Sequence, residues 1–342
     1  MGQTVFVTGA TGYIAKHIIR DLLDAGHSVI GSVRRSGGER EVRDALRPHL
    51  SDPEDAEARL RFAMLDLDRD EGWDSALAGA DALVHTASPF PMTQPKDPQE
   101  LIRPAVDGAR RALAAARAAN IGRVVMTSST VAVIQSPLPR GMSAFDETCW
   151  TDPDAPGMTA YARSKTLAER AAWDFVDQEA PDMALTTINP GLVLGAPLDR
   201  RHGTSVGVIQ RILRARDPML PRMGFPVVDV RDVATMHTRA LERPETAGQR
   251  YLAADRFQWF VDLGQVLKAA YPDRKIVTRQ APDIIVRMLA LFDPAIRSII
   301  PDLGIERPVS NARARDEMDM HFVPAEQSIR DTAAYLLREG MV

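Results

Sequence analysis

A tyrosine and a lysine four residues apart, Tyr161 and Lys165, could act together as an acid and base pair. On a helix, this spacing places the phenol and the ammonium one turn apart on the same face. The phenol can give a proton to a developing alkoxide, and a nearby positive charge favours the phenolate and lowers the pKa of the phenol. Taken alone, the pair could also be two ordinary helix residues. The spacing therefore raises proton transfer as a hypothesis that other residues must support.

Two serines, Ser128 and Ser129, follow the apolar run Arg123–Thr127, which has the pattern of a buried strand. Ligands of parallel sheets bind beyond the carboxyl ends of the strands. A serine hydroxyl at this edge could therefore hold a carbonyl oxygen. The alternative is that the serines only terminate the strand.

The segment Thr8–Ala15, TGATGYIA, lies between a strand pattern and a long amphipathic helix pattern. Here Gly9 permits a tight turn, Gly12 lets the backbone approach a pyrophosphate, and Ala15 lets helix and strand pack closely. The helix N-terminus then offers free N–H groups to the anion. A turn that needs glycine for its geometry alone is the alternative. The predicted contacts are Gly9, Thr11, Gly12, Tyr13 and Ile14.

Two arginines, Arg34 and Arg35, follow the predicted strand Ser28–Val33. A protein that prefers NAD usually has a carboxylate here for the ribose hydroxyls, whereas guanidinium groups offer paired donors to a 2′-phosphate. The pattern therefore predicts NADP(H), although a solvated pair in an arginine-rich chain is the alternative. Further predicted cofactor contacts are Asp66 and Leu67 beside the adenine, and Thr86, Ala87 and Ser88 as a ledge of small residues.

Composition limits the partners. The 342 residues are 45% hydrophobic and carry a net charge of -4 without a block of like charge, so we expect neither nucleic acid nor a membrane as partner. Cys149 is the only cysteine, which excludes an intrachain disulfide, and the histidines lack metal-ligand spacing, so no metal is expected. The first residues lack a basic segment followed by an apolar core, which favours a cytoplasmic protein.

Short apolar runs alternate with longer helical patterns, which predicts an α/β fold with a doubly wound parallel sheet, the Rossmann arrangement. Predicted strands are Thr4–Thr8, Ser28–Val33, Leu60–Leu65, Ala82–Thr86, Arg123–Thr127 and Leu185–Asn189. Predicted helices are Gly12–Ala25, Glu39–Leu46, Leu101–Asn120, Thr159–Glu179, Phe260–Ala270, Asp283–Phe292 and Glu326–Arg338. We expect a dinucleotide-binding domain over residues 1–195, with 227–254 packing back on it, and a smaller, mainly helical substrate region over 196–226 and 255–342.

Together these motifs resemble the extended short-chain dehydrogenases/reductases. The resemblance rests on Thr8-Gly9-x-x-Gly12, Asp66-Leu67, Ser128-Ser129, Tyr161-x-x-x-Lys165, Asn189-Pro190-Gly191 and Asp229–Ala234. Ser32-Val33-Arg34 and His85–Phe90 are similar to the branch of dihydroflavonol reductases, cinnamoyl-CoA reductases and yeast-type carbonyl reductases. That branch reduces carbonyl compounds with NADPH.

The resemblance implies a role for each matching residue. Ser129, or Ser128 if the alignment is shifted by one, would orient the carbonyl, Tyr161 would donate the proton, and Lys165 would contact the nicotinamide ribose. Pro190, Gly191 and Val193 would line the nicotinamide. The substrate would be a small-molecule carbonyl compound, and the helices over Leu101–Asn120 and Thr159–Glu179 resemble the face through which the family forms homodimers.

Two departures argue against either plant-type substrate. The aromatic residues and the cysteine that surround the catalytic tyrosine in cinnamoyl-CoA reductases are absent from Thr159–Arg163, and the asparagine of flavonoid reductases is absent from Thr130–Gln135. Two other functions stay open on this fold: an NAD-dependent nucleotide-sugar epimerase or dehydratase, and a non-catalytic NADP-binding regulator.

Overall fold

A seven-stranded parallel sheet forms the centre of the molecule. The computed structural model describes residues 2–88 and 97–342, so Pro89 and Phe90 of the branch motif lie outside the described residues. The strand order is β3-β2-β1-β4-β5-β6-β9. The strands are β1 Thr4–Thr8, β2 Ser28–Val33, β3 Leu60–Met64, β4 Ala82–His85, β5 Arg123–Thr127, β6 Ala184–Pro190 and β9 Gln249–Ala253. The doubly wound sheet expected from the sequence is confirmed.

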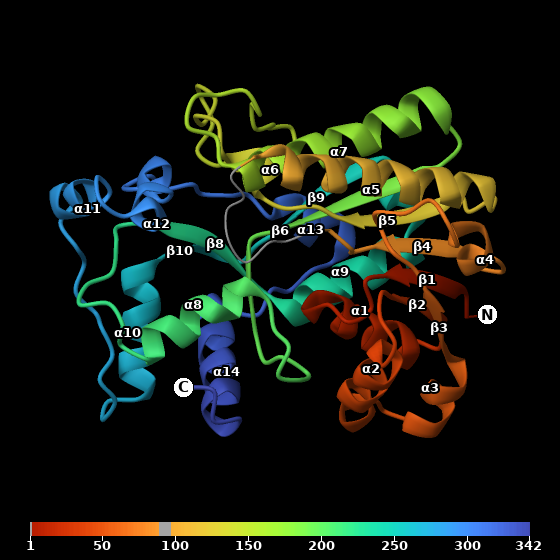
Figure 1. Cartoon of the computed structure of the whole chain (residues 1–342), viewed down its shortest axis with the longest axis horizontal. Coiled ribbons are helices and arrows are strands. Elements are labelled where there is room, and N and C mark those ends of the chain that lie inside the picture. Colours follow the sequence, from red (N-terminus) through yellow and green to blue (C-terminus); the bar gives the residue numbers. More distant parts are fainter. Residues whose placement is uncertain (1, 89–96) are drawn as a thin grey trace.

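Helices cover both faces of this sheet, as Figure 1 shows. Helices α5 (Gln99–Ala118) and α7 (Ala160–Glu179) pack together on one face, and α1 (Tyr13–Asp24) and α9 (Val230–Glu242) on the other. Alternate residues of β1 follow this division: Phe6 packs in the core under α5 and α7, whereas Val5 and Val7 pack in the core under α1 and α9. Burial on both faces explains why the strands are continuous apolar runs.

The remaining helices are short or lie toward the C-terminus. They are α2 Gly38–Leu46, α3 Pro53–Arg59, α4 Trp73–Leu77, α6 Val131–Ile134, α8 Thr204–Leu213, α10 Phe260–Ala270, α11 Asp283–Leu289, α12 Pro294–Arg297, α13 Ala312–Met318 and α14 Ala325–Arg338. Within residues 2–88 and 97–342, no helix is both long and apolar enough to cross a membrane.

A second sheet of three strands lies beside the large one, and the sequence pattern does not predict it. Its order is β10-β8-β7, with β7 Leu192–Leu194, β8 Gly224–Asp229 and β10 Arg256–Trp259. Strands β7 and β10 are short, and Pro226 within β8 argues against a strand because proline lacks the N–H group of a ladder. Residues 227–229 therefore belong to the small sheet, whereas α9 and β9 belong with the large one.

Gly191 is the single residue between β6 and β7, where the chain passes from the large sheet to the small one. A Cβ atom at this position would lie 2.2 Å from the carbonyl oxygen of Pro226. The Gly191 N–H donates to the Ala253 carbonyl at 3.0 Å. Only glycine allows the two sheets to approach this closely.

Candidate active site and cofactor site

The N-terminus of α7 brings the tyrosine and the lysine to the carboxyl edge of the large sheet. The side chain of Thr159 caps this helix by accepting from the Ala162 N–H at 3.1 Å, so Tyr161 and Lys165 fall in its first two turns. The Tyr161 phenol shares a side-chain hydrogen bond with Ser129, which follows β5 and is only 7% exposed. The structure thus brings these residues of the predicted site together.

The two serines have different surroundings. The Ser128 hydroxyl donates to the carboxylate of Glu169, a completely buried residue of α7. Ser129 instead faces Tyr161. Of the two serines that the sequence leaves open, Ser129 is therefore the one that lies beside the phenol, and its role in holding a carbonyl oxygen stays a prediction.

Burial dominates the electrostatics of the pair. It lowers the pKa of Lys165 to about 8, against the opposing charge of Glu169. It also raises the pKa of Tyr161, which the hydrogen bond from Ser129 only partly offsets. The sequence predicts a lowered phenol pKa, whereas in the structure the loss of hydration raises the pKa of Tyr161. With a raised pKa, the Tyr161 phenol carries its proton at neutral pH.

The turn between β1 and α1 has the geometry of an anion site. Gly9 has φ +69°, and a Cβ atom there would meet the Ala87 side chain at 3.1 Å. Gly12 is the N-cap of α1, is exposed, and provides no side-chain cap for the first N–H groups of the helix. These groups have no acceptor within the helix. The residues therefore fit a dinucleotide pyrophosphate.

Two residues of this turn use their side chains elsewhere. The Tyr13 hydroxyl is buried and donates to the Gly195 carbonyl at 3.0 Å, and Ile14 packs against the core under α1. Their predicted contact with the cofactor would therefore run through the backbone.

Arg34 and Arg35 are exposed at the end of β2. Arg35 pairs with Glu41 on α2, and Glu41 also accepts from Arg201 at 2.9 Å. Arg35, Glu41 and Arg201 line a cavity of about 740 Å³ together with Asp44, Ala45, Leu198, Asp199 and Arg200. Three guanidinium groups and three carboxylates thus line this cavity, and Arg34 is not among its lining residues. Neither Glu41 nor Arg201 was predicted to lie beside Arg35. Arg201 is distant from Arg35 in sequence, so no local pattern indicates this contact.

The other predicted cofactor residues are attached to the sheet edge. The Thr86 and Ala87 N–H groups each donate to the Thr8 hydroxyl at 3.0 Å. These bonds hold the segment of small residues 86–88 against the end of β1. Leu67 packs against Gly108 of α5, while Asp66 is half-buried. Pro190 accepts from the Thr130 N–H at 2.9 Å, and Gly191 and Val193 follow where the two sheets meet.

The model of the NAD dependent epimerase/dehydratase family matches residues 5–254. The chain belongs to this family. Membership agrees with the resemblance to the extended short-chain dehydrogenases/reductases. The match begins in β1 and ends just after β9, so it spans the large sheet apart from Thr4.

Several family members are similar along nearly the whole chain. Cinnamoyl-CoA reductase 1 of Arabidopsis thaliana is 33% identical over 99% of this chain and 90% of its own length. Ketoreductase azaE of Aspergillus niger is 34% identical over 99% of both chains. The structure of yeast methylglyoxal/isovaleraldehyde reductase Gre2 complexed with NADPH has a TM-score of 0.80 and 26% identity, covering 99% of this chain and 100% of that one.

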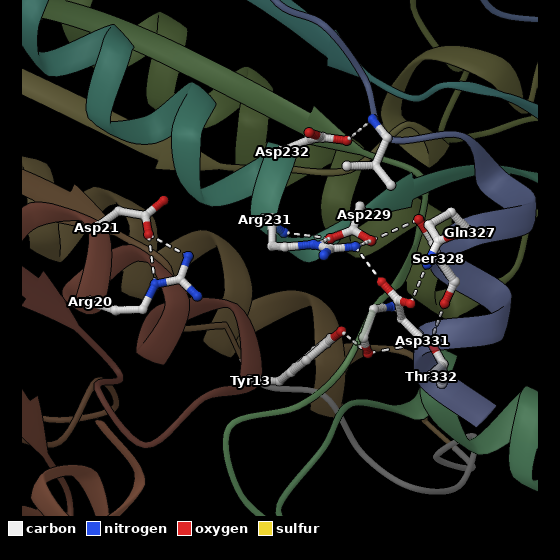
Figure 2. A network of polar contacts seen from close by, with 12 residues as sticks. Tyr13, Arg20, Asp21, Asp229, Arg231, Asp232, Gln327, Ser328, Asp331 and Thr332 are labelled. Carbon is white, nitrogen blue, oxygen red and sulfur yellow. Dashed lines mark hydrogen bonds and ion pairs between the residues drawn. The ribbon is translucent and has the colours of Figure 1, made fainter. Parts of the chain in front are cut away.

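In the present chain, a network of polar side chains joins the C-terminal helix α14 to α9 (Figure 2). Arg231 lies between Asp229, at 2.8 Å, and Asp331 of α14, at 2.6 Å. Ser328 also donates to Asp229 at 2.7 Å. The Asp229–Ala234 segment therefore connects the substrate region expected from the sequence to the large sheet.

A second network was also not predicted from the sequence. Glu169 lies one turn beyond Lys165 and pairs with Arg250 of β9 at 2.7 Å. The spacing from Lys165 to Glu169 is a local signal that could identify the carboxylate. Arg250 has no such signal, because it is 81 residues away.

Proposed function

We propose that this protein is an NADPH-dependent reductase that converts an aldehyde or ketone to an alcohol, and reversibly acts as a dehydrogenase. The observation that carries the proposal is the hydrogen bond between Tyr161 and Ser129. Tyr161 lies one helical turn before Lys165 on α7, at the same sheet edge as the turn between β1 and α1. Relatives along the full length are named as reductases, and the Gre2 structure was solved with NADPH.

When bound, NADPH would supply the hydride to the carbonyl carbon. Ser129 would donate a hydrogen bond to the carbonyl oxygen and hold it beside the phenol. Tyr161 would transfer its proton from Oη to the same oxygen as negative charge develops there. The Lys165 ammonium would bind the nicotinamide ribose and favour the phenolate that remains.

The proposed cofactor site extends from the phosphate turn to the nicotinamide side. Arg34 and Arg35 would bind the 2′-phosphate and so favour NADPH over NADH. The other proposed contacts are Gly9, Thr11, Gly12, Tyr13, Ile14, Asp66, Leu67, Thr86, Ala87, Ser88, Tyr161, Lys165, Pro190, Gly191 and Val193. Residues 196–226 and 255–342 would shape the pocket for the carbonyl compound.

We also propose a cytoplasmic homodimer that pairs through α5 and α7. Support comes from the close packing of these two long helices on one outer face of the sheet. Light scattering of the purified protein would test the assembly, and a monomeric mass would exclude it.

The function is tested by incubating the purified protein with NADPH or NADH and a panel of aldehydes and ketones, and following the loss of cofactor absorbance. We expect oxidation of NADPH, and a much slower reaction with NADH. Absence of reaction with every carbonyl compound would refute the reductase, and a preference for NADH would refute the role of Arg34.

The variant Tyr161→Phe separates catalysis from binding. It removes only the hydroxyl that donates the proton, so turnover should fall by about 10²- to 10⁴-fold. NADPH binding, measured by fluorescence of the bound cofactor, should change by less than about twofold, well under 1 kcal/mol. Near-normal turnover would contradict the assignment.

A further inference from the structure

A buried ion pair lies directly behind the proposed active site. Glu169 is 0% exposed, Arg250 is 8% exposed, and Arg250 Nε lies 2.7 Å from Glu169 Oε1. Removing two charges from water costs free energy that is recovered only with excellent geometry and additional hydrogen bonds. Well-packed apolar residues often stabilise such a position equally well. The pair therefore points to a role other than stability alone.

The Glu169 carboxylate is saturated with donors. Oε2 accepts from Asn189 Nδ2 at 2.7 Å and from the Ser128 hydroxyl, and Oε1 accepts from Thr187 Oγ1 at 3.1 Å and from Arg250. A carboxylate has about four acceptor positions, and all four are occupied here. Its orientation is consequently fixed, and it requires negative charge to satisfy four donors.

One of these donors reaches the serine that faces Tyr161. Asn189 Nδ2 donates to the backbone carbonyl of Ser129 at 3.2 Å as well as to Glu169. The neighbouring Ser128 is held by its hydroxyl on Glu169 and by its N–H on the Ile188 carbonyl at 2.7 Å. Glu169 thus fixes the backbone from which the Ser129 hydroxyl projects.

The same carboxylate is the negative neighbour of Lys165. It lies four residues further along α7, on the same face, and opposes the effect of burial, which lowers the pKa of Lys165 to about 8. From β4, Lys165 is faced by His85. Burial, reinforced by the charge of Lys165, lowers the pKa of His85 to about 4, so this imidazole is neutral at pH 7. The other titratable group on this helix face is the Tyr161 phenol, which is also neutral there.

Arg250 extends the network to the segment that precedes α7. Its guanidinium donates to the backbone carbonyls of Glu147 and Cys149 at 2.8 Å each, and lies 3.6 Å from the centre of the Trp150 ring. The ion pair therefore connects this segment, α7 and the ends of β5 and β6.

We propose that Glu169, held by Arg250, is a positioning residue of the reduction site, which keeps Lys165 charged and holds Ser129 against Tyr161. The inference rests on the proposed function. It assigns a task to a buried charge that the transfer of hydride and proton does not itself use.

The test compares the wild type with Glu169→Gln and with the double variant Glu169→Gln/Arg250→Met, which leaves no unpaired guanidinium if the single variant does not fold. Glu147→Gln is the matched control. It neutralises another buried carboxylate beside Arg250, and its amide oxygen can still accept the hydrogen bond that Leu252 N–H makes to Glu147 Oε1 at 3.0 Å.

Two quantities are measured against pH: the NADPH dissociation constant, from fluorescence of the bound cofactor, and kcat and KM for a carbonyl substrate. Loss of the negative charge of Glu169 should shift the alkaline limb of both pH profiles to lower pH by about one unit. The kcat should fall at least about tenfold, with a smaller change in KM. Glu147→Gln should keep the wild-type limb.

A merely structural role would lower activity and stability without moving either limb. Unshifted limbs in the folded single variant would therefore overturn the proposal. The double variant also loses the positive charge of Arg250, so its limbs should shift less, and a wild-type kcat in it would overturn the proposal. If the wild type reduces no carbonyl compound, the proposed function fails, whereas the NADPH titration still tests whether Glu169 sets the charge of Lys165.

Discussion

At the scale of single residues, the proposed chemistry depends on two protonation states that burial affects in opposite ways. Tyr161 must carry its proton to donate it, and burial raises the pKa of this phenol. Lys165 must carry a proton to remain positive, and burial lowers its pKa to about 8. The window in which both are protonated therefore ends where Lys165 titrates.

This window gives a pH dependence for the reduction reaction. The kcat/KM for NADPH-dependent reduction should be flat near pH 7 and fall as pH rises above about 8, because Lys165 then loses its charge. Steady-state rates with a non-ionisable ketone would show this fall in kcat/KM. They are measured between about pH 5.5 and 10, roughly the range in which catalytic groups titrate. A profile that is flat through pH 10 would contradict a catalytic role for the Lys165 ammonium.

The two adjacent serines form a matched pair for mutagenesis. Ser129→Ala removes the proposed donor to the substrate oxygen, so kcat should fall by about 10²- to 10³-fold with little change in thermal stability. Ser128→Ala removes a donor to buried Glu169, so it should lower the free energy of unfolding by about 1–3 kcal/mol. Thermal unfolding and kcat are measured on both variants, and equal loss of kcat in the two would argue against the distinction.

At the scale of elements, the sequence predicts the helices and strands that have a clear apolar period. It does not predict the strands and contacts that depend on residues distant in the chain. The strands from β1 to β6 and the helices α1, α5 and α7 are long enough for their apolar pattern to identify them. Strands β7 and β10 are too short for such a pattern, and β8 contains Pro226. Ser129, Tyr161 and Lys165 follow from local motifs, whereas the pairing of Glu169 with Arg250 forms only when β9 joins the sheet.

Helix α9 contains a buried carboxylate, Asp232, whose ionisation costs free energy of folding. Asp232 is 6% exposed, and burial raises its pKa to about 7, with Asp229 and Asp255 adding to the rise. Its pKa in an unfolded chain is about 3.9. The folded state therefore prefers the protonated form, and this contribution to stability is lost as pH rises from about 4 to about 7.

Asp232→Asn should remove this cost and still accept the Val323 N–H, which Asp232 Oδ2 accepts at 2.9 Å. We expect the free energy of unfolding to rise by about 2–4 kcal/mol at pH 8 and by less than about 1 kcal/mol at pH 4.5. Urea unfolding at the two pH values measures the difference. Equal effects at both values would show that ionisation of Asp232 is not involved.

At the scale of the whole molecule, the chain returns to the large sheet as β9, between strands β8 and β10 of the small sheet (Figure 1). Helix α14 is attached to α9 through Arg231, Asp229 and Asp331. Thr332 of the same helix accepts from the Gly195 N–H at 2.7 Å, and Gly195 in turn accepts from Tyr13 of α1. The C-terminal helix therefore binds both halves together (Figure 2).

Arg231→Met tests this connection. Asp229 is completely buried and would lose its guanidinium partner, but Arg231 is itself 43% exposed, so the expected loss is about 1–3 kcal/mol in the free energy of unfolding. Asp331→Asn changes the more exposed of the two aspartates that pair with Arg231, so it should lower the free energy of unfolding by less. Calorimetry should show one cooperative transition in the wild type and a lower midpoint in Arg231→Met. An unchanged midpoint would contradict the connection.

The passage of the chain through Gly191 has a consequence for how such a protein can change over evolution. Strands β6 and β7 are separated by one residue, so an insertion there would displace the small sheet relative to the large one. The segment between β7 and β8, by contrast, can lengthen or shorten while both of its anchoring strands stay paired. In the proposed reductase, where residues 196–226 would shape the pocket, new substrate preferences could therefore arise by changes in the length of that segment, without disturbing the alignment of the residues proposed to transfer the proton.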